Sequence, residues 1–344
     1  MSDIAVIGAG AWGTALAIVM GRQHGKHNVR LWAFEKEVCD SITQTAVNRL
    51  FLSDLPIPLS VIPTNSLEEA LTYAEIVVSV MPSHHCRRLF QQMAPYLKPE
   101  MMFVSATKGV ENDTLLRMTE VISQIICTQG WPSAPRIGAL SGPSFAREVA
   151  RGDPTAITVA SRSPELASRV QSEFSDPSFR IYTSDDVIGV ELGGALKNII
   201  AIAAGICDGL GLGHNTIAAL ITRGLAEISR LAVACGARPE TMSGLAGLGD
   251  LVLTCTGGLS RNRSVGVELG QGHQLKQIIA GMHGMVAEGV LTTNAAMGLA
   301  KKMGVEMPIT EQMHAILHDG REPREAIREL MTRRATSEVA LYVT

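Results

Sequence analysis

The first twenty residues constrain the fold more than any other part of the chain. A short β-branched run, Ile4–Ile7, leads directly into Gly8-Ala9-Gly10-Ala11-Trp12-Gly13 and then into small residues that suit a helix. In such a motif the first glycine allows a tight turn, the second lets the backbone approach a pyrophosphate, and the third lets the helix pack on the strand. The helix N-terminus also directs N–H groups at the diphosphate. Gly8, Gly10 and Gly13 therefore predict a dinucleotide-binding strand–turn–helix unit.

A second strand-like run, Val29–Ala33, ends near Glu35. An acid about twenty residues after the glycines accepts hydrogen bonds from the 2′-hydroxyl of NAD and repels the 2′-phosphate of NADP. Three cations lie nearby in sequence and could instead pair with that phosphate, namely Arg30, Lys36 and Arg49. The sequence therefore favours use of NAD and leaves NADP open.

Strand-like runs alternate with helical stretches through the first half of the chain, which predicts a doubly wound, parallel α/β sheet. Further strands are expected at Ile76–Val80, Met102–Ser105, Ile137–Leu140 and Ala156–Ala160. In open α/β sheets, ligands bind outside the carboxyl ends of the strands. Pro82, Lys108 and Ser141–Ser144 follow three of these strands, so we expect them around one ligand crevice.

The pattern changes after about Asp186. From Val187 onward apolar residues recur at helical spacing, punctuated by glycines, and no alternating strand pattern is evident. A chain of 344 residues is long enough for two cores, since one domain takes roughly 100–200 residues. We predict a Rossmann-type dinucleotide-binding domain at residues 1–186 and an all-helical substrate and catalytic domain at residues 187–344.

Lys197 lies inside the otherwise apolar run Leu192–Ile202, beside Asn198. A buried ammonium without partners costs several kcal/mol, so this one needs a carboxylate, an anionic ligand or water. Lysine also changes its pKa readily on desolvation, which suits proton transfer to a reacting oxygen. A lone lysine at a helix edge would more simply extend its ammonium to solvent. Because this chain also carries a dinucleotide motif, we take Lys197 as the candidate catalytic residue.

Two other segments of the second half carry polar chemistry. Asp250, in the glycine-rich run Gly247–Leu251, could orient the lysine ammonium and balance its charge, although aspartate is common in such turns for local reasons. Ser260-Arg261-Asn262 offers a guanidinium suited to phosphate, with two neutral hydrogen-bonding side chains beside it. Alone, this segment is more typical of a solvated loop or a helix cap than of a phosphate site.

Composition and charge exclude several classes of protein. A net charge of −3 and a pI near 6.3 give no basic footprint for nucleic acid. The six cysteines are scattered, with no CxxC and no His/Cys cluster at metal spacing, so we expect free thiols and no metal. The N-terminus enters a strand directly, and the apolar stretch Ile199–Ile206 is shorter than the ~20 residues that span a bilayer. We expect a cytoplasmic protein without membrane insertion.

Several segments taken together resemble the bacterial type of NAD(P)-dependent sn-glycerol-3-phosphate dehydrogenase family. The resemblance extends to about residue 310, and its most specific parts are Ser141–Val149 and the region from Lys197 to Asp250. The motifs that carry it are Gly8–Ala15, Ala106–Gly109, Leu140–Val149, Glu191–Asn198, Arg223–Glu227, Gly244–Leu251 and Ser260–Asn262.

This resemblance implies reversible hydride transfer between NAD(P)H and dihydroxyacetone phosphate, giving sn-glycerol 3-phosphate for phospholipid synthesis. Lys197 would donate the proton on ketone reduction and accept it on the reverse reaction, in a homodimeric enzyme. The implied substrate residues are Lys108, Gly142, Ser144, Lys197, Asp250, Ser260, Arg261 and Asn262. The cofactor residues, with the glycines and Glu35 included, are Gly8, Gly10, Ala11, Trp12, Gly13, Glu35, Lys108, Ala146, Arg261, Val286 and Glu288.

The chain departs from the family pattern at two positions. Ala11 stands where the family often has serine, and Phe34 where it often has arginine, which puts a preference for NADP in doubt. A β-hydroxyacid or 6-phosphogluconate type of dehydrogenase is the alternative enzyme, but its asparagine would follow the lysine by about one helical turn, whereas Asn198 is adjacent to Lys197. A cofactor-binding regulatory protein without turnover is the alternative outside enzymes.

Overall fold

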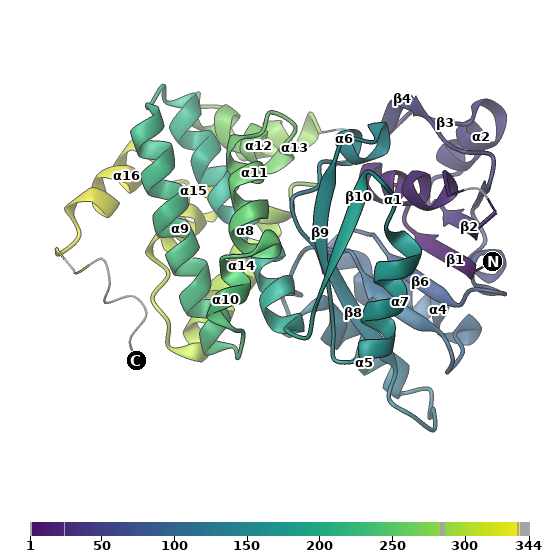
Figure 1. The fold of residues 1–344 in the computed structure, drawn as a ribbon. Coiled ribbons are helices and arrows are strands. Elements are labelled where there is room, and N and C mark those ends of the chain that lie inside the picture. The colour runs from purple at the N-terminus through teal and green to yellow at the C-terminus, as the bar shows by residue number, and fades with distance from the viewer. Residues whose placement is uncertain (1, 24, 283–285, 336, 338–344) are drawn as a thin grey trace. The chain divides into compact units, whose positions relative to one another are not determined.

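The computed structural model describes residues 2–23, 25–282, 286–335 and 337 (Figure 1). Contacts divide the chain into two units. A sheet unit comprises Met1–Thr107 and Met118–Val187, and a helical unit comprises Lys108–Arg117 and Ile188–Thr344. Residues 108–117, which the sequence assigned to the first domain, thus group with the helical unit. The boundary after residue 186 stays a prediction about folding units, which limited proteolysis would test.

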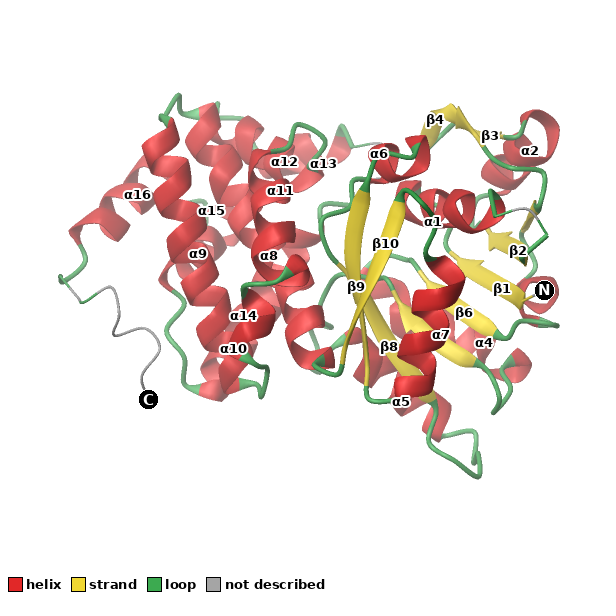
Figure 2. Cartoon of the chain, in the orientation of Figure 1, coloured by secondary structure: helices red, strands yellow, loops and turns green. Residues whose placement is uncertain are grey.

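The sheet unit is built on eight strands in the order β10-β9-β8-β7-β6-β1-β2-β5 (Figure 2). Their bounds are β1 (Ser2–Ile7), β2 (His27–Trp32), β5 (Val61–Thr64), β6 (Ile76–Ser79), β7 (Met102–Ser105), β8 (Arg136–Ser141), β9 (Thr155–Ser161) and β10 (Phe179–Ser184). β1 lies between β2 and β6 and is parallel to both, with Ile7 opposite Trp32 and Ser79. Strand order therefore reverses at β1, the place where a doubly wound sheet binds its ligand.

The sheet differs from the prediction at one end, because β9 pairs antiparallel with β8. Two neighbouring parallel strands need a long crossover, usually an α-helix, that carries the chain from the end of one strand back to the level where the first strand began. The only regular element between these strands is α6 (Ala146–Arg151), whose six residues span about 9 Å. β10 then pairs parallel with β9. Every pair from β8 through β7, β6, β1 and β2 to β5 is parallel, as expected.

Helices cover both faces of the sheet. α1 (Ala11–Gly21), α6 and α7 (Pro164–Phe174) neighbour one another, and α3 (Leu67–Leu71), α4 (Cys86–Met93) and α5 (Met118–Cys127) form a second group (Figure 1). The remaining elements are α2 (Lys36–Thr45), a hairpin of β3 (Val47–Asn48) and β4 (Leu52–Pro56), and the 3-10 turns η1 (Ser83–His85) and η2 (Ala94–Tyr96). Fully buried aromatic side chains such as Phe90, Phe103 and Phe174 fill the space between sheet and helices.

All regular elements described after Val187 are helical. They are α8 (Val187–Gly209), α9 (His214–Ala234), α10 (Pro239–Met242), the π-helical turn η3 (Leu245–Gly249), α11 (Asp250–Thr256), α12 (Arg261–Gly270), α13 (Leu275–Ala280), α14 (Glu288–Met303), α15 (Pro308–His318) and α16 (Pro323–Thr332). α8 is buried at every residue from Gly189 to Cys207, so it is the core helix around which the others pack (Figure 1).

By length and composition α8 qualifies as a membrane-spanning helix, and the bent pair Pro239–Thr256 and Arg261–Gly270 would also qualify if counted as one span. Protein atoms bury 94% of the apolar window of α8. α12 packs against it at backbone contact: a Cβ on Gly205 would lie 2.0 Å from the carbonyl oxygen of Arg263, and one on Gly266 would lie 2.0 Å from that of Ile202. Burial and close packing of this kind are those of a core helix.

Candidate active site

The turn between β1 and α1 has the geometry that its glycines predict. Gly8 has a φ of +120°, and a Cβ there would lie 2.5 Å from the carbonyl oxygen of Val80. A Cβ on Gly13 would lie 1.8 Å from the carbonyl oxygen of Gly8, so only glycine allows this close packing of helix on turn. Gly10 is the N-cap of α1, and a Cβ there would meet nothing within 4 Å. A tight turn, a helix N-terminus and open space thus coincide.

Glu35 follows β2 as the half-buried N-cap of α2. Of the cations that could bind a 2′-phosphate instead, Lys36 donates to Asp40 at 2.7 Å and Arg30 lies 3.6 Å from a carboxylate oxygen of Asp3. Arg49 is exposed near the start of the hairpin. Two of these three cations therefore have carboxylate neighbours of their own.

The predicted substrate loop follows β8 at the carboxyl edge of the sheet. Gly142 has a φ of +146°, and a Cβ there would press on Ile157 at 2.9 Å. The hydroxyl of Ser144 donates to the carbonyl oxygen of Gly142 at 2.9 Å, and Ala146 begins α6. Ala11 and Trp12 lie in the first turn of α1, where the indole Nε1 of Trp12 is buried without an acceptor among the described residues. A ligand acceptor would satisfy that donor.

In the helical unit, Lys197 on α8 is buried, with 7% of its side chain exposed. Its ammonium contacts Oδ1 of Asp250 and donates to Thr254 Oγ1 at 2.7 Å. The Thr254 hydroxyl donates to the Asp250 carbonyl oxygen at 2.6 Å, which directs its lone pairs at Lys197. The carboxylate that a buried ammonium requires is therefore Asp250, as the sequence suggested.

Lys108 lies on the other side of the same carboxylate. Its ammonium donates to Oδ2 of Asp250 at 2.7 Å, and 18% of its side chain is exposed. Burial lowers the pKa of Lys197 to about 8, against the opposing attraction of Asp250 and with the help of the charge on Lys108. Burial alone would raise the pKa of Asp250, but Lys108 and Lys197 outweigh it and hold that pKa below its usual value. Asp250 thus stays ionised, while Lys197 can exchange its proton near neutral pH.

The segment 108–117 is held within the helical unit at several points. Val110 is buried in the helical core, and Leu115 packs against that core close to Gly298. Arg117 donates to Oε2 of Glu191 on α8 at 2.6 Å, with both side chains largely buried. These contacts place Lys108 beside Asp250 although the two residues lie 142 positions apart in sequence.

The N-terminus of α12 carries the Ser260-Arg261-Asn262 segment. The Ser260 hydroxyl caps the helix, accepting from the Arg263 N–H at 3.2 Å. The Asn262 amide donates to Oδ1 of Asn198 at 2.9 Å, and its own Oδ1 accepts from the Gly289 N–H at 3.0 Å. Arg261 is exposed, so among the three it is the side chain most available to a ligand.

Val286 and Glu288 lie at the start of α14, where Glu288 is the first helical residue and an acidic neighbour of the Arg261 charge. The network through Asn262 and Gly289 therefore joins this helix start to the lysine helix. The Asn262 carboxamide makes two hydrogen bonds within the protein, and because its amide nitrogen carries two N–H groups, its contact with the substrate stays a prediction.

Sequence reasoning missed two contacts of this site. Thr254 was not singled out, although it stands four residues after Asp250 on one helix face. Lys108 was predicted to contact the ligands from the first domain, and nothing in the local sequence pairs it with Asp250. The described residues hold no group of His, Cys, Asp and Glu fit for a metal, and their cysteines are free thiols.

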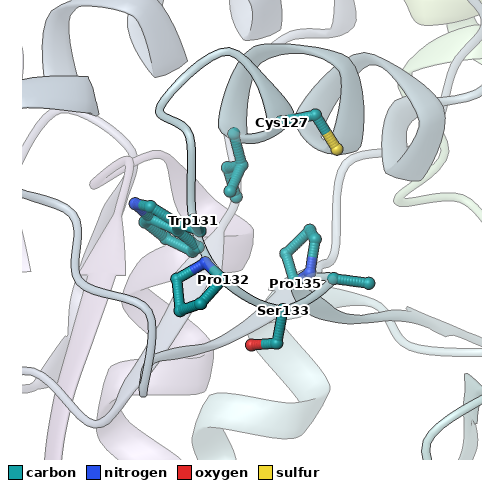
Figure 3. Close-up of a pocket in the computed structure, with 7 residues that line it drawn as sticks. Cys127, Trp131, Pro132, Ser133 and Pro135 are labelled. Carbon is teal, nitrogen blue, oxygen red and sulfur yellow. The ribbon is translucent and has the colours of Figure 1, made fainter.

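A hollow of about 220 Å³ lies beyond the end of α5 in the sheet unit (Figure 3). It is lined by Ile126, Cys127, Trp131, Pro132, Ser133, Ala134 and Pro135. None of these is a predicted site residue, so the hollow lies apart from the predicted site.

The chain matches two family models, the NAD-dependent glycerol-3-phosphate dehydrogenase N-terminus over residues 3–167 and its C-terminus over residues 186–328. It is 69% identical to glycerol-3-phosphate dehydrogenase [NAD(P)+] of Koribacter versatilis, covering 99% of this chain and 100% of that protein. The corresponding protein of Acidobacterium capsulatum is 56% identical, over 97% and 98%. A crystal structure of glycerol-3-phosphate dehydrogenase from Coxiella burnetii superposes with a TM-score of 0.91 at 40% identity, over 96% and 99%. The chain therefore belongs to the NAD-dependent glycerol-3-phosphate dehydrogenase family.

Proposed function

We propose that this protein reduces dihydroxyacetone phosphate to sn-glycerol 3-phosphate with NADH or NADPH, reversibly, with Lys197 as the proton donor and acceptor. The observation that carries the proposal is the buried Lys197–Asp250–Lys108 cluster. A lysine with a pKa of about 8 can hold or release a proton under physiological conditions. The Asp250 carboxylate beside it favours the ammonium form and opposes the loss of that proton.

Lys197 acts on the substrate oxygen in this mechanism. A bound nicotinamide supplies or takes the hydride at the carbon atom. The Lys197 ammonium donates a hydrogen bond to the carbonyl oxygen and passes its proton as negative charge develops there. In the oxidation direction its neutral amine accepts the hydroxyl proton. Asp250 and Thr254 hold the Nζ atom in place during both transfers, because each contacts it directly.

The substrate phosphate fits best at the N-terminus of α12. This helix offers backbone N–H groups and the positive end of its dipole, and Arg261 adds a guanidinium. Ser260 and Asn262 shape this helix start through their own hydrogen bonds, and we assign both to the substrate together with Arg261. Lys108 adds positive charge, and Gly142 and Ser144 contribute from the loop after β8.

Residues of the sheet unit fit a dinucleotide. The open space at Gly10, the α1 N-terminus and the unsatisfied indole N–H of Trp12 suit the diphosphate half of NAD or NADP. We assign Gly8, Ala11, Gly13, Glu35 and Ala146 to the same function, with Lys108, Arg261, Val286 and Glu288 contributing from the helical unit. The cofactor would thus be bound mainly by residues 1–186 and the chemistry supplied mainly by residues 187–344.

Three broader assignments follow from the family. We propose that the product supplies glycerophospholipid synthesis, that the enzyme works in the cytoplasm, and that it forms a homodimer. Sedimentation of the purified protein against a concentration series tests the last of these directly.

The decisive experiment is a comparison of initial rates. Dihydroxyacetone phosphate should be reduced with NADH or NADPH, whereas glyceraldehyde 3-phosphate and unphosphorylated dihydroxyacetone should react far more slowly. Product identification as the sn-3 enantiomer completes the test. Equal rates with all three carbonyl compounds would contradict the proposed substrate.

A further inference from the structure

The hairpin between α2 and β5 reaches the dinucleotide turn through one side chain. Asn48, at the end of β3, is completely buried. Its amide nitrogen donates to the carbonyl oxygen of Ala9 at 2.7 Å and to Thr14 Oγ1 at 2.8 Å. Its amide oxygen accepts from the Phe51 N–H at 3.1 Å. This asparagine therefore links the hairpin to both ends of the turn.

The contact with Ala9 fixes the direction of a peptide plane. In a planar trans peptide the carbonyl and the next N–H point in opposite directions. Asn48 holds the Ala9 carbonyl toward itself, so the N–H of Gly10 points the other way, away from Asn48. Main-chain N–H groups of this turn are the ones that bind a diphosphate.

Thr14 alone would hold this carbonyl weakly. Its hydroxyl also donates to Ala9 O, but at 3.3 Å, and that hydroxyl in turn accepts from Asn48. Without the asparagine amide, Ala9 O loses its shorter hydrogen bond and the buried Thr14 loses a donor. Glycines on both sides of Ala9 leave the peptide free to rotate.

We propose that Asn48 is a positioning residue for the dinucleotide cofactor, which orients the Gly10 N–H toward the diphosphate without touching it. The proposal deepens the cofactor assignment made above and is independent of the assigned substrate. It predicts an effect on the affinity for NADH that is separate from the proton chemistry at Lys197.

The test replaces Asn48 by alanine and measures NADH binding by fluorescence together with full kinetics. A lost orienting hydrogen bond should weaken NADH binding roughly tenfold to a hundredfold. The kcat at saturating NADH and the KM for dihydroxyacetone phosphate should change less than about threefold. Gln171→Ala is the matched control, since that side-chain amide donates to the main-chain carbonyl of Ile181 on β10, away from the turn.

A second variant, Asn48→Asp, keeps the size of the side chain. Its ionised carboxylate cannot donate to Ala9 O, and its negative charge opposes the diphosphate, whereas its protonated form regains one donor. NADH affinity of this variant, measured relative to the unchanged protein, should therefore recover as the pH falls. Melting temperatures measured over the same pH range show whether the recovery reflects orientation of the turn or regained stability.

Results that contradict the role of Asn48 differ from the result that contradicts the cofactor assignment. The proposal is wrong if both variants bind NADH like the unchanged protein, or if affinity, kcat and melting temperature all fall in parallel as one loss of structure. If the unchanged protein itself binds no NADH, the cofactor assignment fails rather than the role of Asn48.

Discussion

The two units offer ligands different kinds of groups. In the sheet unit, the proposed contacts are mainly main-chain N–H groups arranged by Gly8, Gly10 and Gly13. In the helical unit they are charged side chains, with Asp250 held between Lys108 and Lys197. Main-chain groups bind well where the backbone can come close, whereas proton transfer needs a side chain whose pKa can be moved. Binding of the cofactor and chemistry on the substrate should therefore respond to different mutations.

Removing the Lys197 ammonium should give the largest difference between an effect on catalysis and an effect on cofactor binding. Lys197→Ala should lower kcat by ~10²–10⁴, the usual contribution of general acid–base catalysis. NADH affinity by fluorescence should stay within a few-fold of the original, because the glycine turn is untouched. Lys197→Arg should not restore activity, since a guanidinium does not release its proton. Lys302→Ala, at an exposed position of α14, is the control, and near-normal turnover without Lys197 would refute its role.

The phosphate site gives the next largest effect. Arg261→Ala should reduce kcat/KM for dihydroxyacetone phosphate about tenfold to a hundredfold, because a charge-assisted hydrogen bond contributes ~1.5–3 kcal/mol. At saturating NADH, the rate with unphosphorylated dihydroxyacetone should hardly change. Arg263→Ala is the matched control, because Arg263 lies on the same helix but pairs with Asp208. If both substrates lose rate equally, Arg261 does not bind the phosphate.

The pH dependence tests the lysine environment. Ketone reduction needs protonated Lys197, so its rate should fall as pH rises through about 8, while oxidation should rise over the same range. Thr254→Val removes a hydrogen bond to the ammonium, favours the neutral amine and should move both midpoints to lower pH. Reduction at pH 8 should then slow by roughly tenfold. Thr292→Val is the control, since the buried Thr292 hydroxyl has no partner among the described residues. Unmoved midpoints would exclude this function of Thr254.

The smallest effect concerns cofactor choice in the sheet unit. Glu35→Ser should raise kcat/KM for NADPH relative to NADH by a few-fold, because it removes a charge that repels the 2′-phosphate. The gain is modest since Lys36 and Arg30 already have carboxylate neighbours, which leaves Arg49 as the nearby exposed cation. Glu37→Ser on the same helix is the control, and an unchanged ratio would place the specificity residue elsewhere.

The sheet unit was the more predictable half of the fold. Continuous apolar runs predicted β1, β2, β6, β7, β8 and β9 within a few residues, because buried parallel strands are apolar on both faces. β5 and β10 were missed. β10 alternates buried Phe179 and Ile181 with exposed Arg180 and Tyr182, and β5 is only four residues long and contains Pro63. Such edge strands give a weak sequence signal.

The helical site was less predictable, for a physical reason. Lys197 could be recognised because an ammonium in an apolar helix is costly, and that cost also indicated that a carboxylate was needed. Which groups surround the ammonium depends on helix packing. Thr254, one helical turn after Asp250, accepts a hydrogen bond from the ammonium. Lys108, in the loop before α5, donates to the Asp250 carboxylate. Contacts between residues so far apart in the chain produce no pattern of spacing that a single sequence could reveal.

That inserted loop also limits how this gene can be rearranged. The chain leaves the sheet unit after Thr107, returns at Met118 and leaves again after Val187. A fragment of residues 188–344 would therefore lack Lys108 and the apolar side chains of Val110 and Leu115 that pack with its core. Recombination between related genes at a single crossover near residue 187 would combine residues 108–117 of one parent with the helices of the other. Successful chimeras need to inherit residues 108–117 together with the helices, as one unit of exchange.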